Sequence, residues 1–183
     1  MQDPPPLARL CARRWAVPIL ADLEGSKGCK FVTLAAHLDG SRAALKASLG
    51  LLETLGLVIP NPGHGHPMRP EYVLTQRGAL LTGPAKSLVR ALDKTQALEF
   101  GLRKWSMPMV HVIHSGQERF GGIAEALGPV TDRAVSLALT DLQDNGWVKR
   151  KLFNDRPPRS IYSVARKAQR FAPMLTDLGL ALE

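Results

Sequence analysis

The chain repeats itself, and this internal repeat limits the possible folds more than any other feature of its 183 residues. The segment Arg14-Trp15-Ala16-Val17-Pro18 returns 90 positions later as Lys104-Trp105-Ser106-Met107-Pro108. More pairs follow in the same order, 89 or 90 positions apart: Phe31 and Phe120, Leu38 and Leu127, Gly56 and Gly146, Val58 and Val148, and Tyr72 and Tyr162. Chance does not repeat Trp, Pro, Phe, Gly and Tyr in one order. The sequence therefore predicts two domains, 1–93 and 94–183.

The opening of each unit predicts two helices. The spacing of apolar residues places them at 7–23 and 31–38 in the first unit, and at 100–113 and 120–127 in the second. Pro18 and Pro108 lie inside the longer helices, where a proline ring clashes with the preceding turn. We expect both helices to be kinked there.

A third helix follows in each unit, with start and stop signals at matching positions. Ser41 and Thr131 are expected N-caps, because a hydroxyl oxygen can accept a hydrogen bond from a free backbone N–H of the first turn. Gly56 and Gly146 are expected to end the helices in the left-handed conformation.

Two short β-prone segments and a last helix complete each unit. The segments are 57–59 and 72–75 in the first unit, and 147–150 and 161–164 in the second. The last helices are expected to enter near Pro84 and Pro173, and the first of them to run on to Leu98. The predicted fold is mainly α with small β-hairpin wings: two winged helix-turn-helix domains in tandem, arranged as a pseudo-dimer.

Charge and cysteine content narrow the class of protein. Lys and Arg exceed Asp and Glu by 24 to 16, a formal net charge of +8, which attracts phosphate backbones or anionic membranes. Two cysteines do not make a disulfide framework. The sequence also shows no signal peptide and no apolar run long enough to span a membrane. We expect a cytoplasmic, nucleoid-associated protein without membrane contact.

These motifs resemble those of the HxlR group of MarR-related winged-helix transcription regulators. The resemblance rests on the Arg-Trp or Lys-Trp opening, the Phe that starts the short helix, and the Gly-Leu-Val before the wing. It includes the wing return Tyr72-Val73-Leu74-Thr75, and it covers nearly the whole chain twice. The first copy matches well, whereas the second has Ser163-Val164-Ala165 in place of Leu-Thr. The resemblance implies sequence-specific binding to double-stranded DNA and a dimer through the terminal helices.

The third helix of each unit is the expected recognition helix. Its apolar stripe leaves a second face for base edges in the major groove. The residues expected to contact DNA there are Ser41, Arg42, Ala43 and Lys46 in the first unit, and Thr131, Arg133, Ser136 and Thr140 in the second. Asp132 stands beside Arg133, so the two helices present different chemistry.

The wings are expected to contact the DNA backbone or minor groove. The second wing contributes Lys149, Arg150, Lys151, Arg156 and Arg159. The first wing contributes Arg69 and the two histidines His64 and His66. This difference predicts more backbone affinity from the second unit.

Other possible sites in the sequence are weaker. His64 with His66, and His111 with His114, have spacings that suit a metal, but neither pair has nearby further ligands. Cys11 and Cys29 form no Cys-x-x-Cys pair, so inert thiols are expected. Trp15 and Trp105 are expected in the core. No catalytic motif is present, and we expect no enzyme activity, cofactor or metal.

The expected partner is a promoter site that is asymmetric or pseudo-palindromic, because the two recognition helices differ. A homodimer through the terminal helices is a further possibility. The alternative function is a tandem winged-helix module with an architectural, replication or protein-interaction role on the chromosome. The basic charge argues against a role that involves proteins alone.

Overall fold

The computed structural model describes residues 3–61, 71–154, 156 and 158–183. The first half contains α1 (Pro6–Leu10), α2 (Ala16–Asp22), β1 (Cys29–Lys30), α3 (Phe31–His37), α4 (Arg42–Thr54), β2 (Val58–Pro60), β3 (Glu71–Leu74) and α5 (Gln76–Lys94). The second contains α6 (Leu98–Gly101), α7 (Ser106–His114), α8 (Phe120–Leu127), α9 (Asp132–Asp144), β4 (Val148–Phe153), β5 (Arg159–Val164), α10 (Arg166–Gln169) and α11 (Ala172–Leu182). The mainly helical fold with small hairpins is as predicted.

The first helix of each half is divided in two, which corrects the prediction of one helix kinked at proline. The chain leaves the helical conformation before Trp15 and before Trp105, and a new helix begins after each tryptophan. Pro18 and Pro108 are the third residues of α2 and α7, where a missing N–H costs nothing because the first turn has no intrahelical partner. The first helical bond comes one residue later, as Ile19 N–H donates to Trp15 O at 2.9 Å.

The helix-turn-helix pair has the predicted caps in both halves. The hydroxyl oxygens of Ser41 and Thr131 each accept a hydrogen bond from a backbone N–H three residues on, both at 3.2 Å. Gly56 and Gly146 follow the ends of α4 and α9 with φ of 68° and 67°. α4 and α9, the predicted recognition helices, therefore begin and end at the predicted signals.

Both hairpins are present, but their described strands differ in length. In the first, β3 pairs with β2 on one side and with β1 on the other, a short strand that the sequence analysis did not predict. In the second, β4 and β5 pair over six residues each. The segment of the second half that corresponds to β1 is not a strand. It still contacts the hairpin, because Tyr162 N–H donates to Glu118 O at 2.8 Å. The halves therefore share one plan, and the described strands of the hairpin are longer in the second half.

The last helices depart from the prediction in two places. α5 begins at Gln76 and passes through Pro84, so it does not enter at that proline. It also stops at Lys94 and does not reach Leu98, because Gln96 takes the left-handed conformation, with φ of 53°. In the second half, the same region divides into α10 and α11, and α11 enters at Pro173 as predicted.

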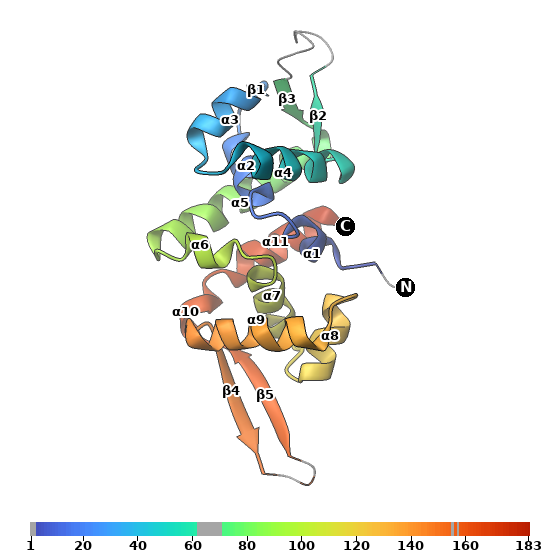
Figure 1. Ribbon diagram of the computed structural model, residues 1–183, viewed down its shortest axis with the longest axis vertical. Coiled ribbons are helices and arrows are strands. Elements are labelled where there is room, and N and C mark those ends of the chain that lie inside the picture. The colour runs from blue at the N-terminus through green and yellow to red at the C-terminus, as the bar shows by residue number, and fades with distance from the viewer. Residues whose placement is uncertain (1–2, 62–70, 155, 157) are drawn as a thin grey trace.

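The two halves meet through their last helices. α5 packs against α2 of its own half and against α11 of the other. The start of α5 lies at the end of α11, where the Arg77 guanidinium donates to the Leu182 carbonyl at 2.9 Å. Figure 1 shows the result: α5 and α11 cross the middle of the molecule, and the two hairpins project from opposite ends of its long axis. In the described part of the chain, no helix is long and apolar enough to cross a membrane.

Gly78 provides a test of the packing of α5. A Cβ at Gly78 would overlap the backbone carbonyl of Leu57, whereas a Cβ at Gly50 in α4 would meet nothing within 4 Å. Gly78→Ala should lower the free energy of unfolding by about 1–3 kcal/mol or more, because backbone cannot move aside cheaply. Gly50→Ala, the control, should raise it by about 0.5–1 kcal/mol. Denaturant unfolding of both variants checks this, and equal effects would contradict the packing.

Candidate nucleic-acid interface

The first recognition helix buries one face and exposes the other. Leu45, Leu49 and Leu52 are at most 1% exposed and anchor α4 in the core. Ser41, at the cap, and the predicted contact residues Arg42, Ala43 and Lys46 are all exposed. The Lys46 ammonium lies 5.8 Å from the centre of the Phe31 ring on α3, so its side chain is partly held while its charge remains available.

The second recognition helix has the same division but a different surface. Val135, Leu139 and Leu142 are buried, and the predicted residues Thr131, Arg133, Ser136 and Thr140 are exposed. Leu137 stands on the same face with 59% of its surface exposed. A basic side chain, hydroxyls and an apolar group therefore occupy this surface, whereas α4 offers Arg42 and Lys46.

The second wing gathers its cations mainly on one face. Residues alternate between faces along a strand, and the register pairs Lys149 with Ser163, Lys151 with Ile161 and Phe153 with Arg159. Lys149, Lys151, Phe153 and Arg159 therefore share a face. The Lys151 and Arg159 charges lie 4.9 and 5.0 Å from the centre of the Phe153 ring between them. Such contacts hold long side chains in place and lower the entropy lost on binding a phosphate.

Arg150 lies on the other face of the same wing. Its guanidinium donates to the Ser160 hydroxyl at 2.9 Å and lies 6.0 Å from the centre of the Tyr162 ring. Arg156, at the tip, is exposed. The structure thus brings together the basic residues predicted for this wing, but divides them between two faces.

The described part of the first wing carries little charge. Ile59 and Pro60 are exposed, and the Asn61 amide donates to the Glu71 carboxylate at 2.8 Å. Arg69, which was predicted to contact DNA, and the histidines His64 and His66 lie outside the described residues. The basic surface that the structure describes on the wings therefore belongs to the second half.

Figure 1 shows how these surfaces are related. α4 and α9 both lie on the side turned to the viewer, across the long axis, one on each side of the centre. Each is followed by the hairpin at its own end of the molecule. The two predicted recognition helices therefore lie on one side of the protein, one from each half.

Four more exposed cations were not among the predicted sites. Arg13 and Arg14 precede Trp15 in the α1–α2 connection, and Arg103 and Lys104 precede Trp105 in the α6–α7 connection. In the sequence, these segments indicated the repeat and were not predicted to contact DNA. The alignment of Arg14 with Lys104 was nevertheless a signal that could have identified them.

Trp15 and Trp105 pack against the core, as predicted, although neither is fully buried. A Cβ added to Gly40, in the turn before α4, would lie 2.7 Å from Cε2 of Trp15. In the second half, a Cβ on Gly128, in the turn before α9, would lie 3.1 Å from the Cα of Pro4. The turn before α4 therefore packs against Trp15, and the turn before α9 packs against the N-terminal segment.

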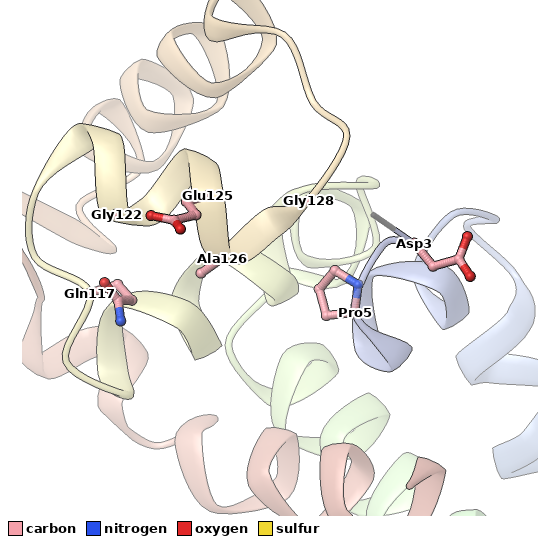
Figure 2. Close-up of a pocket in the computed structure, with 7 residues that line it drawn as sticks. All are labelled: Asp3, Pro5, Gln117, Gly122, Glu125, Ala126 and Gly128. Atoms are coloured by element: carbon pink, nitrogen blue, oxygen red, sulfur yellow. The ribbon is translucent and has the colours of Figure 1, made fainter. Parts of the chain in front are cut away.

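Figure 2 shows the hollow that the N-terminal segment forms beside α8. Asp3 and Pro5 face Gln117, Gly122 and Glu125 across an open space of about 470 Å³. Both ionisable side chains in it are carboxylates, so it repels phosphate and does not extend the candidate interface.

The cysteines and histidines form no reactive or metal site in the part of the chain described. Cys11 and Cys29 are buried and unpaired, and burial raises the pKa of the Cys11 thiol to about 12. Burial, with a smaller effect of His114, lowers the pKa of His111. The described residues contain no group of three or more metal-ligating side chains. The histidines His64 and His66 lie outside that part.

Two helix-turn-helix pairs followed by hairpins define a protein of the winged helix-turn-helix class. The chain belongs to the HxlR-like helix-turn-helix family, whose pattern matches residues 102–180. That match falls on the second half of the chain, whereas the sequence motifs of the family are closer in the first half.

Two sequence relatives support this assignment. An uncharacterised HTH-type transcriptional regulator of Halalkalibacterium halodurans is 33% identical over 41% of this chain and 67% of its own length. The uncharacterised regulator YvaP of Bacillus subtilis is 30% identical over 46% and 78%. The crystal structure of diamide-treated YodB from B. subtilis is 20% identical and covers 48% of this chain and 87% of that one, with a TM-score of 0.42.

Thiol reactivity tests the packing around Cys11. A pKa of about 12 lowers the thiolate fraction near pH 8 about a thousandfold relative to the ordinary value of 9.0. In a Cys29→Ser variant, Cys11 should therefore react with Ellman's reagent far more slowly in the native protein than in urea. Equal rates in the two states would show that the thiol is accessible.

Proposed function

We propose that the protein is a sequence-specific, double-stranded DNA-binding transcription regulator in which two winged helix-turn-helix domains, 1–93 and 94–183, act as the two subunits of a dimer do. The observation that carries this proposal is the placement of two capped, outward-facing helices, α4 and α9, on one side of a single chain. Membership of a family of helix-turn-helix regulators and the net charge of +8 support the same function.

The recognition helices would read different bases. Arg42 lies at the first position of α4, so its guanidinium can reach the O6 and N7 acceptors of a guanine. In α9, Asp132 takes that first position and Arg133 the next, followed along the exposed face by Ser136 and Thr140. Carboxylate and hydroxyl groups favour other base edges, and a carboxylate accepts from cytosine N4. One chain would then cover two unlike half-sites.

The wings would supply affinity that depends little on sequence. Lys149, Lys151 and Arg159 share one face of a hairpin with two six-residue strands, where they can neutralise backbone phosphates. Each neutralised phosphate releases counterions, so affinity should fall steeply with salt. The second half would contribute more of this affinity than the first.

The pairing of α5 with α11 takes the place of the dimer interface expected from the family. Leu81, Leu88, Leu175 and Leu178, all on these two helices, are fully buried. Because the terminal helices already pack on each other within one chain, a homodimer through them is not needed to bring two recognition helices to one DNA.

Separate substitutions in helix and wing test the two roles. Arg42→Ala and Arg133→Ala should each cost about 1–3 kcal/mol of binding free energy on the best site and relax the base preference in one half-site. The triple variant Lys149→Ala, Arg150→Ala, Lys151→Ala should weaken binding to all sequences alike and reduce the salt dependence. Titrations by fluorescence anisotropy at several salt concentrations measure both effects.

The charge-matched control is the triple variant Arg90→Ala, Lys94→Ala, Arg170→Ala. These three cations are exposed on α5 and at the end of α10, and none of them belongs to α4, α9 or the wings. The control should change the salt slope less than the wing variant. Affinity that is independent of salt, or a wing variant with altered base preference and helix variants without it, would overturn the assignment.

A further inference from the structure

The two connections before the tryptophans place four cations in the middle of the molecule. In Figure 1 the α1–α2 and α6–α7 connections lie between α4 and α9. Arg13, Arg14, Arg103 and Lys104, which we call the central basic patch, are all exposed there. We propose that this patch binds the phosphates of the DNA segment between the two half-sites. The inference rests on the proposed function and adds a third contact region to it.

The two connections have the same backbone structure. Ala16 N–H donates to Arg13 O at 3.2 Å, and Ser106 N–H donates to Arg103 O at 3.1 Å. Each closes a turn that places two basic side chains and then a tryptophan before the next helix. The patch is therefore made of two equivalent turns, one from each half, as a contact centred between two half-sites requires.

Contacts with both recognition helices fix where the patch lies. Arg103 and Lys104 share a surface hollow of about 300 Å³ with Leu137, which belongs to the exposed face of α9. Lys104 also lines a second hollow, of about 270 Å³, with Thr54 and Leu55 at the end of α4. The patch thus adjoins both helices and can contact the same DNA.

The connections are also linked to each other. Arg14 lies 3.9 Å from Glu99 on α6, the helix that leads into the second connection. Ala12 and Lys104 line the same hollow. The two basic connections therefore adjoin each other.

The side chains are held without being neutralised as a group. The Lys104 ammonium lies 4.6 Å from the centre of the Trp105 ring, and the Arg14 guanidinium 5.4 Å from that of Trp15. Arg103 pairs with Asp141 at 3.1 Å, an exposed pair that phosphate can replace at little cost. No carboxylate in the described ranges lies within ion-pair distance of Arg13 or Lys104. These two charges remain for a partner.

DNA geometry makes the phosphate backbone the matching partner. When two helices occupy successive major grooves, the minor groove between them faces the protein, and a phosphate backbone borders it on each side. Two equivalent basic turns at that point can meet one backbone each. Contacts of this kind position the DNA and carry no sequence information directly.

The double variant Arg13→Gln, Lys104→Gln tests the proposal with one change in each turn and no ion pair removed. Its matched control is Arg90→Gln, Arg170→Gln. Loss of two phosphate contacts should lower the slope of log affinity against log salt by about two and weaken binding about thirtyfold near 0.15 M salt. Base preference in both half-sites should stay unchanged. Circular dichroism and thermal unfolding show that each variant is folded.

Ethylation interference on the same DNA locates the contact. With the unsubstituted protein, ethylation of phosphates between the half-sites should reduce binding. The double variant should lose that interference and keep the interference within the half-sites. If the double variant matches its control, or if central ethylation has no effect, the central basic patch does not bind DNA. Absence of specific binding by the natural sequence would instead overturn the proposed function itself.

Discussion

The packing of α5 against α11 is the constraint on which the rest of the structure depends. Each of these helices is the last element of its half, and together they bury leucines of both, each worth about 1.5–3 kcal/mol. Because α5 also packs on α2 and α11 on α7, a shift between α5 and α11 would carry whole halves with it. The relative positions of α4 and α9 follow from this contact.

The two halves have equivalent scaffolds and unequal surfaces. Ser41 and Thr131, and Gly56 and Gly146, begin and end the recognition helices in the same way. The exposed residues of α4 and α9 differ, and so do the described strands of the two hairpins. Copies joined in one chain can diverge independently, which the identical subunits of a homodimer cannot do. The proposed reading of two unlike half-sites depends on this freedom.

The sequence predicted those features that local chemistry determines. The caps, the left-handed glycines, the hairpins and the exposed faces of α4 and α9 all follow from signals within a few residues. It did not predict β1, because a two-residue strand exists only through its pairing with β3. The predicted end of α5 was also wrong, because Gln96 adopts a left-handed conformation that few residues other than glycine take. The central basic patch was not predicted, because it forms only when two connections 90 residues apart are brought together.

The central claim is that one chain presents two different recognition helices to one DNA molecule. Selection of binding sites from random double-stranded DNA, followed by native mass spectrometry of the best complex, tests it most directly. The account predicts an asymmetric consensus of two unlike half-sites, roughly one helical turn apart, bound by a single chain. A strictly palindromic consensus bound by two chains would contradict it.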